Sequence, residues 1–176
     1  MAHSSDNRIL VSGVFALLAT WFYLFGLFQV YQAFKPTSSL VRNTVIVCFA
    51  GILTAYGVVH GAFIAIATSA KLSVEFGLDI NAVTSLASDV NDAIRLFVYP
   101  LFALLSAIFI YQVWKKQTLY PRWIILFFPL VPFIFQSLIG SALTGKIWVV
   151  VMGGFLNLIL VLFFCASTVA LWHKKT

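Results

Sequence analysis

The stretch ILVSGVFALLATWFYLFGLFQVYQAF, from Ile9 to Phe34, is followed at once by the polar turn Lys35-Pro36-Thr37-Ser38-Ser39. An apolar run of this length is typical of a helix that crosses a membrane, because about 20 residues span the hydrocarbon core. The run is longer than the apolar region of a signal peptide, and no small-residue cleavage pattern ends it. It therefore predicts a membrane span and not a cleaved leader.

The composition of the whole chain agrees with a membrane environment. Of its 176 residues, 62% are hydrophobic and only 9% are charged, whereas a soluble domain carries about 25% charged residues. A chain with so few polar groups is expected to fold in lipid, where helices satisfy their own backbone hydrogen bonds. We predict an all-α polytopic membrane bundle that forms one domain over residues 1–176.

Five segments are predicted to cross the membrane, and they lie at about residues 9–34, 43–70, 93–114, 122–141 and 147–172. Residues 79–92, between the second and third spans, carry apolar residues at three- and four-residue spacing, which indicates an extracytoplasmic helix. That helix either lies on the outer face or extends the third span outward. Asp79 or Asn81 is expected to cap its N-terminus.

Charge is divided unequally between the two sides of the predicted membrane. Loops 35–42 and 115–122 and the C-terminus hold seven of the 11 basic residues and no acidic residue, whereas the opposite side holds all five acids. The positive-inside rule then places the C-terminus in the cytoplasm and the N-terminus outside. We expect a cytoplasmic (plasma) membrane of the bacterial inner-membrane type. The net charge of +6 is assigned to membrane anchoring, and no nucleic-acid partner is expected.

Several short patterns resemble a known family. These are Tyr120-Pro121-Arg122-Trp123, Tyr56-Gly57-Val58-Val59-His60-Gly61 and Gly153-Gly154-Phe155-Leu156-Asn157-Leu158. Together they resemble a family of uncharacterised microbial membrane proteins that is catalogued only as a domain of unknown function. The resemblance implies about six spans, of which the first is absent from this chain. It implies a fold and no activity.

His60 is the first candidate for a binding residue, because it is the only histidine within a predicted span. An ionisable residue inside a membrane points to a functional site. It lies about ten residues from the outer end of the second span, and Tyr56, four residues earlier, shares its helix face. The alternative is a neutral histidine that bonds across a helix interface, since Gly57 and Gly61 allow close packing.

Three further polar residues in the outer half of the predicted membrane complete the candidate set. Asn157 lies at a depth similar to that of His60, Gln136 follows two prolines in the fourth span, and Tyr99 precedes Pro100 in the third. If their helix faces converge with that of His60, the five side chains line an outward-facing pocket. The alternative for each is a role in helix packing.

Asp89, Asp92 and Arg95 form a charged ladder at the outer end of the third span. This ladder is either part of an outer-face polar cluster or a solvated helix terminus, where acids interact favourably with the helix dipole.

The chain lacks the common sequence motifs of metalloproteases, nucleotide-binding proteins and c-type cytochromes. The chain has no H-E-x-x-H, Walker A, dinucleotide or c-type haem motif, and we predict no cofactor and no metal. The leading hypothesis is a non-enzymatic membrane protein that binds a small apolar or amphipathic, lipid-like molecule. A second hypothesis is an assembly subunit, with a homo-oligomer as one form, whose polar groups join helices. A third is a lipid-modifying enzyme with His60 as a general base.

Overall fold

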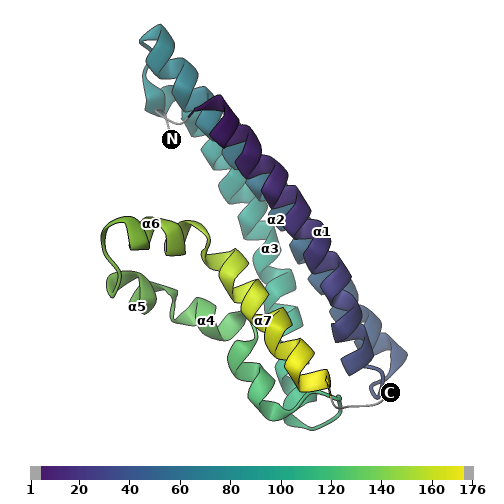
Figure 1. The fold of residues 1–176 in the computed structure, drawn as a ribbon. Helices are drawn as coiled ribbons and strands as arrows, with labels where there is room; N and C mark the ends of the chain where they lie inside the picture. The colour runs from purple at the N-terminus through teal and green to yellow at the C-terminus, as the bar shows by residue number, and fades with distance from the viewer. Residues whose placement is uncertain (1–4, 173–176) are drawn as a thin grey trace. The chain divides into compact units, whose positions relative to one another are not determined.

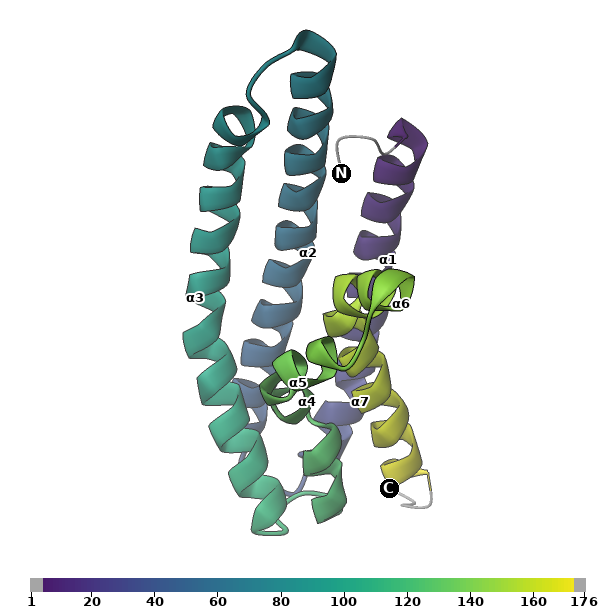
Figure 2. The same ribbon diagram turned by 90° about the vertical axis from the view of Figure 1, so that its left-hand side faces the viewer.

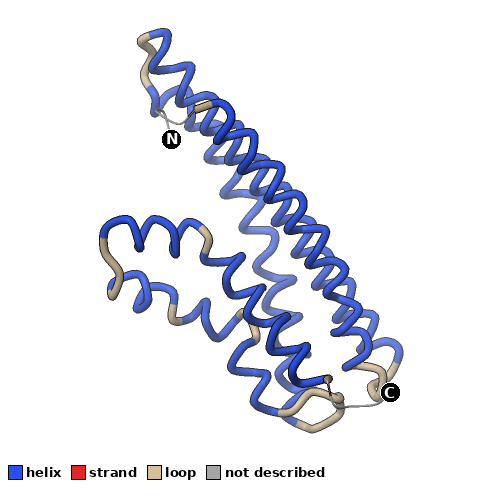
Figure 3. Tube along the Cα trace, viewed as in Figure 1, coloured by secondary structure: helices blue, strands red, loops and turns tan. Residues whose placement is uncertain are grey.

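The computed structural model describes residues 5–172, and within them the chain is helical with no strand (Figure 3). The elements in chain order are α1 (Asp6–Ala33), α2 (Ser39–Phe76), α3 (Ile80–Trp114), η1 (Arg122–Phe127), α4 (Leu130–Ile134), α5 (Gln136–Ser141), α6 (Gly145–Gly153) and α7 (Phe155–Leu171). They form two compact units. The first unit comprises Met1–Leu24 and Cys48–Leu104, and the second comprises Phe25–Val47 and Leu105–Thr176.

Three helices in the described residues, α1, α2 and α3, are each long and apolar enough to cross a membrane. Helices α6 and α7 pass the same test only as a pair, with a bend of 64° between them. The all-helical class is therefore confirmed, with several helices that could span a membrane. The helices support three to four spans, and the predicted count of five is not shown.

The segment 122–141, predicted as one span, is built from the three short helices η1, α4 and α5. Phe128 is extended, with φ −63° and ψ 136°, because a residue that precedes proline is disfavoured in the helical region. Pro129 and Pro132 also lack the backbone donor that a continuous helix needs. Pro129 thus ends η1, whereas Pro132 lies within α4 and the break before α5 is at Phe135. The segment is therefore divided where a single helix was predicted.

Helix α2 continues beyond its predicted end at residue 70 and stops only at Gly77, which has φ +66°. The backbone N–H of Leu78 donates to the carbonyl of Ser73 (2.8 Å), and that of Gly77 donates to Val74 (3.4 Å), the pattern of a Schellman motif. Asp79 then caps α3, because its Oδ1 accepts from the N–H of Asn81 at 2.8 Å. The helix predicted around residues 79–92 is therefore an extension of the third span.

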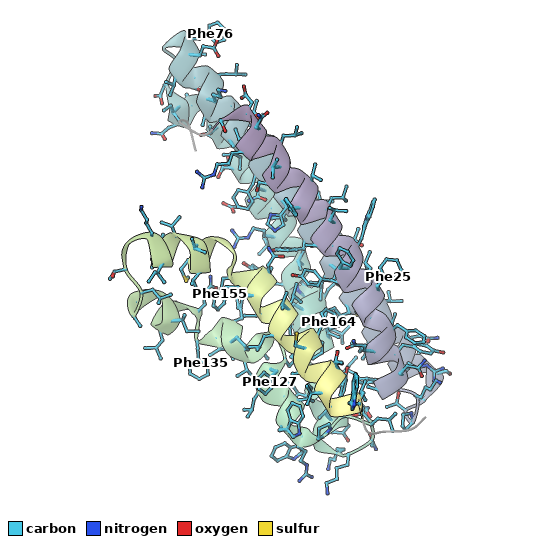
Figure 4. The ribbon with its side chains drawn as sticks, viewed as in Figure 1. Phe25, Phe76, Phe127, Phe135, Phe155 and Phe164 are labelled. Atoms are coloured by element: carbon cyan, nitrogen blue, oxygen red, sulfur yellow. The ribbon has the colours of Figure 1, made fainter. Side chains whose placement is uncertain are left out.

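The first unit contains portions of α1, α2 and α3 that run side by side (Figure 1 and Figure 2). Lys71 on α2 pairs with Asp6 at the start of α1. Most large apolar side chains of these helices are exposed, as Phe25 of α1 is at 79% (Figure 4), which suits a lipid environment.

The second unit is organised around the ring of Phe109, which is fully buried. Its centroid lies 4.3 Å from that of Phe128 in a stacked arrangement, 5.5 Å from Phe34 and 5.8 Å from Phe163. The ring of Tyr120 lies 5.7 Å away. These rings come from the end of α1, the loop before η1, the end of η1 and α7, so one aromatic core joins segments that are distant in the sequence.

Two hydrogen bonds attach the loop 115–121 to this core. The hydroxyls of Tyr120 and Ser167 lie 2.6 Å apart and are buried, and the N–H of Leu119 donates to the carbonyl of Ala33 at 2.8 Å. Burial raises the pKa of the Tyr120 phenol, and the bond to Ser167 offsets only part of that rise. The phenol therefore stays neutral and fixes the loop to α7 as a structural contact.

Replacing Phe109 with alanine is expected to lower the free energy of unfolding by about 3 kcal/mol, because it leaves a cavity among four rings. Phe97→Ala on the same helix is the matched control, since Phe97 is 80% exposed. Denaturant titration in detergent micelles measures both variants. Equal losses for the two substitutions would contradict an aromatic core at Phe109.

Candidate functional site

A cavity of about 150 Å³ lies between α1 and α2 in the first unit. Its lining residues are Arg8, Ile9, Ser12, Gly13, His60, Phe63, Ile64 and Ala67. One part of this lining is polar, with a guanidinium, a hydroxyl and an imidazole, and the rest is aliphatic or aromatic. The cavity therefore combines both chemistries that an amphipathic molecule requires.

The lining follows from helical spacing on both elements. On α1, Arg8 and Ser12 are four residues apart, and so are Ile9 and Gly13. On α2 the same spacing relates His60 to Ile64 and Phe63 to Ala67. Residues four apart lie on one face of a helix, so each helix presents two adjacent rows of side chains to the cavity.

Two close contacts between the helices bracket His60. One turn before it, a Cβ on Gly57 would lie 3.3 Å from Oγ1 of Thr20 on α1. One turn after it, a Cβ on Gly13 would collide with Cδ1 of Ile64. Because both glycines lack a side chain, the helices approach at these two levels and leave space beside His60.

The His60 imidazole is held by aromatic neighbours and lacks a polar partner. The ring of Tyr56 meets it edge-on, with centroids 4.3 Å apart, and the ring of Phe63 lies 6.5 Å away. The Nε2 atom is buried and has no hydrogen-bond partner among the described residues. Leaving a buried polar atom unpaired costs about 1–3 kcal/mol, so this nitrogen favours a water molecule or a ligand atom in the cavity.

Arg8 supplies a positive charge that no described acid neutralises. It is exposed and forms no ion pair within residues 5–172. The neighbouring acid, Asp6, is paired with Lys71. The cavity therefore has a cationic mouth, and an anionic group would compensate its charge.

The predicted site residues are divided between the two units. His60 and Tyr56 lie together in the first unit, which also contains Tyr99, but Tyr99 is 47% exposed and does not line the cavity. Asn157 on α7 and Gln136 at the start of α5 belong to the second unit. A pocket that joins all five residues stays a prediction.

The predicted outer cluster consists of exposed residues on α3. Asp92 and Arg95 form an ion pair of 3.6 Å, with side chains that are 67% and 49% exposed, and Asp89 is also exposed. An exposed pair of this kind contributes little to stability. None of the three lines the cavity.

Arg8 and Ser12 were not among the predicted site residues. The available signal was their four-residue spacing, together with the same spacing of Ile9 and Gly13 next to them. Among residues 5–172, no group of three His, Cys, Asp or Glu side chains is arranged to hold a metal ion.

The two glycines beside His60 give a matched test of the helix contact. Gly57→Val is expected to destabilise the protein by about 1–3 kcal/mol, because the added methyls press on Thr20. Gly61→Val is expected to change stability by less than about 0.5 kcal/mol, because a Cβ there meets nothing within 4 Å. Unfolding in micelles measures both, and a larger loss for Gly61→Val would refute this arrangement of α1 and α2.

Comparison with protein-family models gives a match over residues 1–174 to a family of unknown function, DUF6796. Comparison with curated proteins and with solved structures gave no match. The match agrees with the resemblance to an uncharacterised family, and it carries no span count and no activity. The chain belongs to the family of unknown function DUF6796.

Proposed function

We propose that this protein is an integral membrane protein that binds a small amphipathic molecule and holds its polar head in the cavity between α1 and α2. The observation that carries the proposal is the unpaired Nε2 of His60, in a cavity that also receives the uncompensated charge of Arg8. Ser12 adds a hydroxyl that donates or accepts a hydrogen bond. Phe63, Ile64 and Ala67 supply the apolar side of the same cavity.

The size of the cavity defines how such a molecule binds. Pockets that enclose a whole drug-sized ligand measure about 300–1,000 Å³, and the cavity measures about 150 Å³. It therefore accommodates a head group and not an entire lipid. The hydrocarbon part extends toward the membrane centre along exposed apolar side chains, of which Leu17 is 50% exposed and Val58 is 54% exposed.

Helix lengths support a position of this cavity at the outer edge of the hydrocarbon core. About 20 residues at 1.5 Å each cover its thickness of about 30 Å. The count starts at the basic residues Lys35, Arg42 and Lys115. About 20 residues from these starting points, the helices leave the hydrocarbon core near Phe15 on α1, Ala62 on α2 and Arg95 on α3. His60 then lies about 3 Å inside the boundary. This is much shallower than the sequence analysis expected, because α2 extends well past the membrane before it ends.

In the proposed orientation the N-terminus is outside and the C-terminus is in the cytoplasm, with the plasma membrane as the location. Charge asymmetry supports it, because loops 35–42 and 115–122 carry basic residues without acids. The segment 122–171 leaves from the cytoplasmic side and returns to it, either as two spans or as a re-entrant hairpin. The orientation of α1, α2 and α3 is the same in both cases.

Single cysteines test the orientation. Ser38→Cys and Asn81→Cys are introduced singly in a background where Cys48 and Cys165 are alanine; both positions are exposed. In intact cells, a membrane-impermeant maleimide is expected to label position 81 and not position 38. Permeabilised cells control for reactivity, since both cysteines should then be labelled. Labelling of position 38 alone in intact cells would reverse the orientation.

One observation favours assembly as a second function. Gly61 is exposed, and a Cβ added there meets no atom within 4 Å. Ala65 lies four residues further along the same face and is also exposed, so another helix can approach closely at this face. The enzyme hypothesis has less support, because no carboxylate lines the cavity and neither Asp92 nor Tyr99 reaches it.

Mass spectrometry of co-purified lipids and metabolites tests ligand binding. We expect a species that is enriched with the wild type and depleted at least about tenfold in His60→Ala and in Arg8→Gln, since loss of a charge-assisted hydrogen bond removes about 1.5–3 kcal/mol. Arg95→Gln is the control, because Arg95 is exposed on α3 and does not line the cavity. Identical profiles for all four proteins would reject the binding proposal and favour assembly.

A further inference from the structure

The loop between α3 and η1 in the second unit is a separate concentration of positive charge. Lys115, Lys116 and Arg122 are exposed, and residues 115–122 contain no acid. The hydrogen bond from Leu119 N–H to the Ala33 carbonyl brings this loop to the end of α1, two residues before the exposed Lys35. No described ion pair involves any of these four cations.

Lys116 occupies a backbone conformation that favours glycine. Its φ is +58°, and it is the only non-glycine residue with positive φ among the described residues. Its N–H donates to Val113 and that of Gln117 donates to Gln112, at 3.0 and 2.9 Å, so Lys116 sits where a Schellman motif usually has glycine. A lysine there strains the backbone. The ammonium group of Lys116 therefore points to a role outside the fold of the loop.

Aromatic side chains place the neighbouring cations at a membrane surface. The Arg122 Nε donates to the Trp114 carbonyl at 2.9 Å, and its guanidinium lies 5.0 Å from the Trp114 ring. The Lys115 ammonium lies 5.9 Å from the Tyr111 ring. Trp114 and Tyr111 are 59% and 56% exposed. Exposed tryptophan and tyrosine beside basic residues are typical of the level of lipid head groups.

Hydrogen bonds within the protein hold the backbone of the loop. Thr118 Oγ1 accepts from the Tyr120 N–H at 3.2 Å, and the Tyr120 hydroxyl bonds to Ser167 within the buried core. A site whose backbone is fixed in advance loses less entropy on binding than a flexible one. Lys116, in contrast to Arg122 and Lys115, has no aromatic or polar side-chain partner within residues 5–172, so its ammonium remains free for a ligand.

We infer that residues 115–122, together with Lys35, form a binding site for the phosphate-bearing head groups of anionic phospholipids in the adjacent leaflet. Lys116 provides the principal contact, and Lys115, Arg122 and Lys35 contribute to the positive field around it. An ammonium group is a point-charge donor that suits phosphate. The site is independent of the ligand proposed for the cavity between α1 and α2, and it requires only that the protein resides in a membrane.

Lys116→Gly separates this role from any structural one. In detergent without added lipid, the midpoint of thermal unfolding is expected to rise relative to the wild type, because glycine relieves the positive φ. Titration with short-chain phosphatidylglycerol is expected to stabilise the wild type, with an apparent affinity that falls about fivefold in Lys116→Gly and in Lys116→Gln. Lys146→Gln, on α6, is the charge-matched control and should retain the wild-type affinity.

Two control ligands, a zwitterionic lipid and a phosphate without a lipid, determine whether the site recognises an anionic lipid. Short-chain phosphatidylcholine is expected to stabilise the wild type and Lys116→Gln equally, without the difference seen with phosphatidylglycerol. Inorganic phosphate at the same concentration is expected to give no stabilisation. The inference is overturned if phosphatidylglycerol binds all variants equally, if Lys146→Gln loses as much affinity as Lys116→Gln, or if inorganic phosphate reproduces the whole effect.

Discussion

The packing of rings around Phe109 is the interaction on which the second unit depends. Lipid chains are as apolar as the side chains of a helix, so helices in a membrane associate through close contact and not through escape from water. Aromatic rings provide a large contact area with defined geometry. Phe109 of α3 contacts Phe34, Tyr120, Phe128 and Phe163. It therefore holds together the loop after α1, the loop between α3 and η1, the end of η1, and α7.

The sequence predicted the existence of the long helices and missed some of their limits. The second span was predicted to end at residue 70, yet α2 continues to Phe76, where the positive φ of Gly77 ends it. Residues 122–141 were predicted as one span, whereas the extended Phe128 before Pro129 ends η1. Residues 147–172 were also predicted as one span, whereas Gly154 lies at a bend of 64° between α6 and α7. Hydropathy records none of these effects, because each depends on a tertiary partner or on backbone geometry.

His60 was named as a candidate from the sequence, and the cavity beside it adds candidate residues from a second helix. His60 and its contact with Tyr56 follow from composition and four-residue spacing on a single helix. Arg8 and Ser12 belong to a different helix, so their place beside His60 depends on the register of α1 against α2. That register is set by Gly13 and Gly57, whose missing side chains admit Ile64 and Thr20. A single sequence shows such glycines but does not show which neighbour approaches each one.

Polar groups are proposed to bind at both edges of one bilayer. The claim on which the proposed function most depends is that His60 lies at the outer edge. Nitroxide labels at Val58, Ala65 and Leu72, all exposed positions on α2, measure depth by collision with oxygen and with a water-soluble nickel complex. We predict that oxygen dominates at residue 58 and the nickel complex at residues 65 and 72. Dominance of oxygen at all three positions would place His60 deep in the hydrocarbon core and contradict the account.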